Sequence, residues 1–95
     1  MFVVIKYNKK ALKVIRSVQP RLRDEMIAAI EEVHADPEGT IVKTQRVVGG
    51  TSQRRIRVGA FRILYEWVAG DGEDVMHVLN VVPRGQVYRR RYVKD

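Results

Sequence analysis

The sequence predicts one α+β domain, in which two helices pack on one face of a mainly antiparallel, four-stranded sheet. Between residues 9 and 35, apolar residues recur at the spacing of amphipathic helices. Between residues 52 and 82, three short runs rich in β-branched residues follow one another, as strands do. With a further strand at the start, the order is strand, helix, helix, strand, strand, strand. The chain has 95 residues, enough for a single domain, residues 1–95, with one modest core.

The first half of the chain is expected to hold one strand and both helices. Phe2–Lys6 is a short apolar run rich in β-branched residues, which predicts a strand. Asn8 is a good N-cap for the first helix, whose apolar stripe lies opposite a lysine-rich face. Pro20 either ends this helix or begins the second, because proline fits the first turn of a helix and not its interior. We expect the second helix to stop at Asp36-Pro37-Glu38-Gly39.

Three strands are expected in the second half, after a connection over Thr40–Gly50. Gly59-Ala60 joins the first two strands as a two-residue hairpin loop, and glycine at the first central position suits a type II′ turn. The third strand is apolar on both faces apart from His77 and Asn80, which predicts a place inside the sheet. The three strands are expected over Ser52–Val58, Phe61–Val68 and Asp74–Val82.

The formal net charge is +7, and its distribution is uneven. From Lys43 to Arg62 there are six basic residues and no acidic one, and from Arg84 to Lys94 there are five more, again without acid. A field of one sign attracts a polyanion, so we expect nucleic acid or an acidic protein as partner. The alternative is a chain that is kept soluble by excess positive charge.

Several classes of site are excluded or disfavoured. The chain contains no cysteine, so it has no disulfide and no thiolate metal site. His34 and His77 stand far apart in the sequence, so we expect no zinc site. No apolar run is long enough to span a membrane, and Met1–Ile5 lacks the charged start and long apolar stretch of a signal peptide. We therefore expect a cytoplasmic protein without metal, cofactor or membrane contact.

The parity of the predicted hairpin gathers arginines on one face of the sheet. A Gly59-Ala60 loop sets Arg57 opposite Arg62, with Arg55 two residues away on the same face. The alternating apolar residues then face the helices. Like charges directly opposite each other repel, so an anion is expected between them, and phosphate fits the guanidinium fork. The alternative is a solvated strand face on which salt screens the repulsion.

Three segments together resemble the RelE/ParE toxin superfamily. The segment 54–65 is RRIRVGAFRILY, a basic–apolar–basic strand, a glycine turn and then aromatic–Arg–apolar–apolar–Tyr. The segment 81–89 is VVPRGQVYR, with an arginine, three spacer residues and a tyrosine. The segment 7–13, YNKKALK, resembles the superfamily's first strand-to-helix junction. The resemblance covers nearly the whole chain in the right order.

This resemblance implies a microbial-ribonuclease-like fold and the toxin of a type II toxin–antitoxin system. Such a toxin is a ribosome-dependent endoribonuclease that cuts messenger RNA in the A site without a metal ion and so inhibits translation. The 2′-hydroxyl of the RNA attacks the adjacent phosphate and leaves a 2′,3′-cyclic phosphate and a 5′-hydroxyl. The implied partners are messenger RNA, the ribosome and a cognate antitoxin, which we expect to cover the arginine hairpin.

The resemblance also assigns site residues by position. Arg55 and Arg57 match residues at the scissile phosphate, Arg62 and Arg84 match residues that stabilise the pentacoordinate state, and Tyr88 matches a residue that stacks on a base or moves a proton. Preplaced cations are well suited to the charge of that state. The other basic residues expected to bind RNA are Lys43, Arg46, Arg54, Arg89, Arg90 and Arg91.

The proton acceptor departs from the superfamily pattern, in which a lysine or glutamate is expected. Positions 55 and 57 are arginines, which do not readily take a proton. Strand parity sets His77 on the face of Val75, Leu79 and Val81, away from the side that leads to Arg84, which predicts a structural histidine. Glu66 shares a face with Arg62, more as an ion-pair partner than as a base. Tyr88 is then the best proton carrier.

Two other functions remain open. A ParE-like toxin of the same fold poisons DNA gyrase and needs no nuclease site; the set Arg62, Arg84 and Tyr88 argues against it. A non-catalytic RNA-binding module would place aromatic residues among the basic strands for base stacking. Tyr65 and Trp67 are instead expected on the core face of the sheet.

Overall fold

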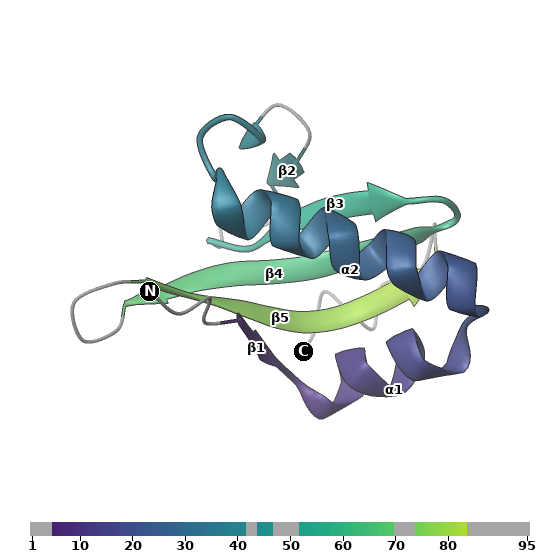
Figure 1. The fold of residues 1–95 in the computed structure, drawn as a ribbon. Helices are drawn as coiled ribbons and strands as arrows, with labels where there is room; N and C mark the ends of the chain where they lie inside the picture. Colours follow the sequence, from purple (N-terminus) through teal and green to yellow (C-terminus); the bar gives the residue numbers. More distant parts are fainter. Residues whose placement is uncertain (1–4, 42–43, 47–51, 70–73, 84–95) are drawn as a thin grey trace.

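Two helices cover one face of a five-stranded sheet in the order β1-β5-β4-β3-β2 (Figure 1). The computed structural model describes residues 5–41, 44–46, 52–69 and 74–83. The sheet is antiparallel except that β1 pairs with β5 in parallel. This confirms the predicted α+β class. The elements are β1 (Ile5–Tyr7), α1 (Lys9–Ser17), α2 (Pro20–Ala35), β2 (Thr44–Arg46), β3 (Arg54–Val58), β4 (Phe61–Ala69) and β5 (Asp74–Pro83).

Both ends of α1 and α2 follow the local chemistry of the sequence. The side chain of Asn8 accepts a hydrogen bond from the Lys10 amide (2.9 Å), which confirms the N-cap. The Asn8 amide in turn donates to the carbonyl of Val78 (2.9 Å), which ties the start of α1 to β5. Pro20 begins α2, so of the two expected roles it has the second. After α2, the Asp36 carboxylate accepts from the Gly39 amide (3.0 Å) and closes the turn.

The core lies between the helices and the sheet. Ala11 and Ile15 of α1 and the stripe of α2 pack against the alternate residues of β3, β4 and β5. Neither described helix is long and apolar enough to cross a bilayer. The buried apolar residues are Ala11, Ile15, Met26, Ile30, Val33, Ile56, Val58, Ile63, Tyr65, Met76, Val78 and Val81, with Val82 buried outside this cluster.

The β3–β4 hairpin has the predicted register, in which Arg57 pairs with Arg62 and Ile56 with Ile63. Gly59 has φ +57°, and no other described residue has a positive φ. A type I′ turn needs two such residues and a type II′ turn one, so the structure agrees with the type II′ turn. The interior place of the last strand is also confirmed, since β5 lies between β1 and β4.

The sheet has five strands and not four, because the expected connection over Thr40–Gly50 contains β2. Three residues of β2 pair with β3 and extend the sheet beyond the hairpin. Four expected strand boundaries also differ: β1 ends at Tyr7, β3 begins at Arg54, β4 ends at Ala69 and β5 ends at Pro83. Phe2–Val4 of the expected first strand lies outside the described residues.

A register shift in β5 changes which of its side chains share a face. Leu64 of β4 pairs with Asn80, but the next residue, Tyr65, pairs with Val78, so Leu79 is an additional residue in β5. Val78 and Met76 are both completely buried in the core. His77 between them therefore faces the side of the sheet opposite to the helices. The expectation that His77 shares a face with Val81 is wrong, because the bulge interrupts the alternation on which it depended.

Candidate functional site

The candidate site is the side of the sheet turned away from both helices, which we call the open face. In Figure 1 helix α2 crosses in front of the sheet, so the open face is the rear side of the sheet. The register brings three arginines of β3 and β4 to this face, as expected from the sequence. Its members, by alternation with the buried core residues, are Gln45, Arg55, Arg57, Arg62, Leu64, Glu66, His77, Asn80 and Val82.

Arg57 and Arg62 are directly opposite each other but differ in environment. Arg57 is exposed, whereas Arg62 is only 6% exposed. The sequence placed Arg62 on the open face, which is confirmed, but did not indicate its burial. A charge that is removed from water attracts an anion more strongly, because the surrounding dielectric constant is lower. The pair therefore combines one arginine that reaches into solvent with one that is held in place.

Arg55 lies two residues before Arg57 on the same face and is held from the side by β2. Its Nε and Nη2 atoms both donate to Oε1 of Gln45, at 3.1 and 2.6 Å. Gln45 is the Cα partner of Arg55 in the β2–β3 ladder. Gln45 is a site residue that the sequence did not predict, because nothing in the sequence marks β2 as a strand. A polar TQR segment offers no period-two alternation that would reveal it.

Arg54 does not share the open face, although we expected it among the RNA-binding residues. It pairs with Tyr65, which is 1% exposed and faces the helices. Its Nε donates to Oγ1 of Thr44 (2.8 Å), and its Nη2 donates to the carbonyls of Thr44 (3.2 Å) and Ile41 (3.4 Å). The parity of β3 already sets Arg54 with Ile56 and Val58, so the sequence did contain this signal. Arg54 fastens the segment that leads into β2.

The other expected site residues are placed only in part. The backbone of Arg46 pairs with Arg54 at the end of β2. Six expected residues lie outside the described part of the chain: Lys43, Arg84, Tyr88, Arg89, Arg90 and Arg91.

Glu66 and His77 form a second polar group on the open face. They are Cα partners in the β4–β5 ladder, and Lys6 of β1 is the partner of His77 on its other side. Glu66 comes four residues after Arg62, so the two are separated by about 13 Å along β4. Among the described residues, no three His, Asp or Glu side chains gather as metal ligands would. This group is distinct from the arginines.

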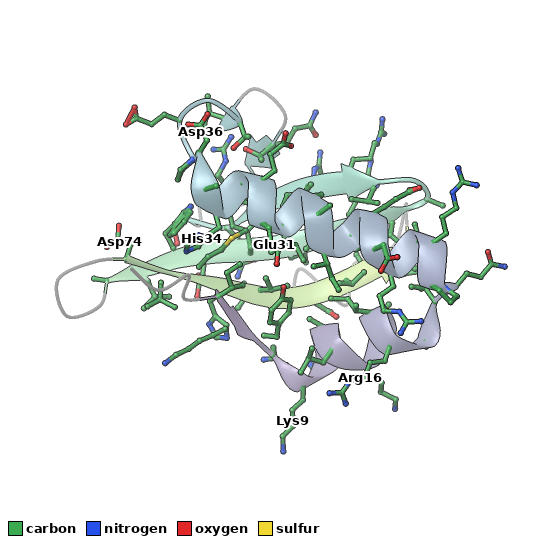
Figure 2. All side chains as sticks on the ribbon, in the orientation of Figure 1. Lys9, Arg16, Glu31, His34, Asp36 and Asp74 are labelled. Carbon is green, nitrogen blue, oxygen red and sulfur yellow. The ribbon has the colours of Figure 1, made fainter. Side chains whose placement is uncertain are left out.

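The helix side of the sheet carries aromatic and titratable groups in structural positions. His34, near the end of α2, packs against Trp67 with ring centroids 5.7 Å apart (Figure 2). Tyr7 is half-buried; burial, together with the carboxylate of Glu31, raises its pKa above the ordinary value of 10.0. Lys9 and Arg16 of α1 project away from the sheet (Figure 2) and are not part of the open face.

Comparisons with known proteins were made for sequence and for structure. Residues 5–88 match the family described as ParE toxin of type II toxin-antitoxin system, parDE. The search of curated proteins gives no match.

Three solved structures are similar in fold. The isolated RelE toxin of E. coli has a TM-score of 0.70 at 19% identity, and the similarity covers 98% of this chain and 94% of that one. The YoeB/ParE toxin from Agrobacterium tumefaciens has a TM-score of 0.72 at 12% identity, with coverage of 85% and 98%. The archaeal RelE–RelB complex from Pyrococcus horikoshii OT3 has a TM-score of 0.68 at 19% identity, with coverage of 90% and 99%. At these identities the likeness concerns the fold.

Proposed function

This chain belongs to the ParE toxin family of type II toxin–antitoxin systems, within the RelE/ParE superfamily, and from this premise we propose that it cleaves messenger RNA on the ribosome. The observation that carries the proposal is the arginine group of the open face. Three guanidinium groups on two adjacent strands face the same side, and two of them are direct cross-strand partners. Such crowding of like charge attracts an anion, and the guanidinium fork suits phosphate. A phosphodiester backbone supplies that anion.

The proposed reaction is a transesterification within the RNA. The 2′-oxygen forms a bond to the adjacent phosphorus, and the bond from phosphorus to the 5′-oxygen of the next nucleotide breaks. The 2′-hydroxyl loses its proton to a base, and the leaving 5′-oxygen gains one. Negative charge grows on the non-bridging oxygens of the pentacoordinate state. Arg62 is buried and needs little reorganisation to stabilise that charge, while Arg55 and Arg57 hold the phosphate.

We assign the proton transfer to Tyr88, with Arg84 as a further stabilising cation. This rests on the superfamily resemblance, since both residues lie outside the described part of the chain. Arginine stays protonated, so the three arginines of the open face cannot act as the base. His77 stands about 13 Å along the sheet from the row of Arg62, whereas a base must come within about 3 Å of its proton. This spacing favours Tyr88 over His77.

The proposed partner in the inactive state is a cognate antitoxin. The similar archaeal structure is a complex of RelE with RelB. A segment of complementary charge that lies over the open face would occupy the phosphate position and prevent RNA from binding. We expect this complex to weaken as the salt concentration rises, because its attraction is in part electrostatic.

The second candidate function is inhibition of DNA gyrase, which the ParE description of the matching family favours. The two candidates differ in what the arginines do. A nuclease needs them at the reacting phosphate, whereas a gyrase poison needs no nuclease site.

The test compares the wild-type protein with Arg57→Ala on ribosomes programmed with a defined messenger RNA, next to a gyrase supercoiling assay. We expect cuts in the A-site codon that leave 2′,3′-cyclic phosphate ends, and a fall of about 100- to 1000-fold in rate for the variant. Lys9→Ala, a charge loss on α1, is the matched control and should cut normally. Inhibited supercoiling without RNA cleavage would establish the gyrase function instead. Binding of RNA with neither RNA cleavage nor inhibition of supercoiling would indicate a non-catalytic RNA-binding module.

Tyr88→Phe tests the proton carrier separately. This change removes the hydroxyl and keeps the ring, so cleavage should fall about 100-fold or more while ribosome binding stays the same. Cleavage at the wild-type rate would show that Tyr88 stacks or packs and that the proton takes another route.

A further inference from the structure

We infer that Gln45 is a positioning residue for Arg55, and that its neutrality is what suits it to this task. The inference rests on the proposed function, because the purpose of positioning Arg55 is to bind the RNA phosphate. Its direct support is the pair of hydrogen bonds from Nε and Nη2 of Arg55 to the single Oε1 atom of Gln45. Two donors from one edge of the guanidinium group, converging on one acceptor, fix the direction in which that edge points.

An amide orients the guanidinium without changing the net charge of the site. A carboxylate at position 45 would accept the same two hydrogen bonds more strongly, but its negative charge would offset that of Arg55. The contact with Gln45 uses two of the five N–H donors of the Arg55 guanidinium group and leaves its positive charge unchanged, so an incoming phosphate still meets a cation. A glutamine therefore meets both requirements, whereas a glutamate meets only one.

The position of Gln45 is itself fixed from the opposite side of the sheet. Thr44, its neighbour in β2, is 5% exposed, and its Oγ1 accepts from Arg54 and donates to the carbonyl of Ile41 (3.1 Å). Arg54 also donates to the carbonyl of Thr44. Three hydrogen bonds thus anchor the first residue of an edge strand that has only three residues.

The consecutive residues Arg54 and Arg55 of β3 consequently contact β2 on opposite faces of the sheet. Arg54 faces the helix side and holds the backbone of β2. The next residue of β2, Gln45, lies on the open face, where it accepts hydrogen bonds from Arg55. Because a strand alternates its side chains between two faces, the adjacent residues Thr44 and Gln45 connect the contacts of the two arginines.

The experiment replaces Gln45 by glutamate and by alanine. Gln45→Glu keeps or strengthens the contact with Arg55, so its melting temperature should equal or exceed that of the wild type. Its cleavage of messenger RNA on programmed ribosomes should nevertheless fall more than that of Gln45→Ala, for which we expect a loss of about 10- to 100-fold. Gln19→Glu, the same charge change at the start of α2, is the matched control and should cut at nearly the wild-type rate.

A second measurement separates positioning from a merely structural contact. In an Arg55→Ala background, Gln45→Ala should have no further effect on cleavage, because the group that it positions is gone. Equal effects of Gln45→Ala with and without Arg55, or wild-type cleavage by Gln45→Glu, would overturn the inference.

A third measurement keeps the inference testable if the protein does not cut RNA. The affinity for a single-stranded RNA oligonucleotide should fall more in Gln45→Glu than in Gln45→Ala, and its dependence on salt should become less steep. If cleavage is absent but this order holds, the proposed nuclease function fails and the positioning of Arg55 stands. If the two variants bind RNA equally, the role assigned to Gln45 is wrong.

Discussion

Arg57 and Arg62 are direct cross-strand partners in the β3–β4 hairpin, and one is exposed while the other is buried. Opposite positions in an antiparallel pair bring side chains within contact distance, and like charges there are destabilising. We therefore expect the pairing of Arg57 with Arg62 to cost some stability at the centre of the candidate site. Stability and RNA binding are expected to change in opposite directions when this contact is altered.

Arg57→Glu tests that opposition. The substitution replaces repulsion by attraction to Arg62 and should raise the free energy of unfolding by about 0.2–1 kcal/mol, measured by urea denaturation. Cleavage of messenger RNA on programmed ribosomes should be lost, because a carboxylate then occupies the phosphate position. Arg16→Glu on α1 is the control for a change of two charges and should keep its activity. A variant that is both less stable than the wild type and active would contradict the prediction.

Two substitutions are needed to test Arg62, because its buried aliphatic stem contributes to packing and its guanidinium group contributes charge to the site. Arg62→Ala removes the aliphatic stem and should destabilise the fold by roughly 1–3 kcal/mol, so its lost activity alone would be ambiguous. Arg62→Met keeps most of the stem and removes the charge. We expect this variant to be more stable than Arg62→Ala and to cut RNA about 100- to 1000-fold more slowly than the wild type. Equal stability of the two variants would show that the stem contributes nothing.

The bulge in β5 predicts contrasting effects at two neighbouring positions. Met76 is completely buried against the helices, so Met76→Ala should cost about 2–5 kcal/mol of unfolding free energy. His77 faces the other side of the sheet and is only partly buried, so His77→Ala should change stability by about 0.5 kcal/mol or less. Thermal and urea denaturation of the two variants provide the measurement. A large loss in His77→Ala together with a small one in Met76→Ala would mean that the alternation runs the other way.

Tyr7 predicts how stability changes at alkaline pH. Burial, and second the carboxylate of Glu31, raise the pKa of its phenol in the folded protein. The neutral phenol is thus favoured by folding; this contribution is complete below the unfolded-state pKa of about 10 and is lost as pH rises through the folded-state pKa. Tyr7→Phe should therefore gain stability relative to the wild type as the pH rises above about 10. Parallel loss in both proteins across that range would exclude the effect.

The sequence predicted most of the fold, because the helices and the hairpin have strong local signals. Asn8 as an N-cap, Pro20 as a helix boundary and Gly59 in a tight turn each depend on backbone chemistry that neighbours in space do not alter; the structure decides that Pro20 begins α2. The pairing of Arg57 with Arg62 follows from the turn alone. Strand β2 was missed, because its three residues form a strand only through pairing with β3 and the hydrogen bonds of Arg54.

The site was predicted less completely than the fold, for two reasons. The bulge at Leu79 has no glycine or other local mark, yet it reverses the face of every β5 residue before it, His77 included. The burial of Arg62 depends on its surroundings in three dimensions, which strand parity does not describe. The contact of Gln45 with Arg55 depends in turn on the unrecognised strand.

The parallel pairing of β1 with β5 determines when during synthesis this protein can become toxic. Ile5 pairs with Met76, so the first strand must wait for the last described strand before it enters the sheet. The core faces of α1 and α2 likewise contact β3, β4 and β5, which are all made later. Contacts this distant in sequence form slowly, since a long loop must close first. A nascent chain therefore cannot complete its five-stranded sheet until β5 has been made, so we expect this toxin to become active only late in its own synthesis.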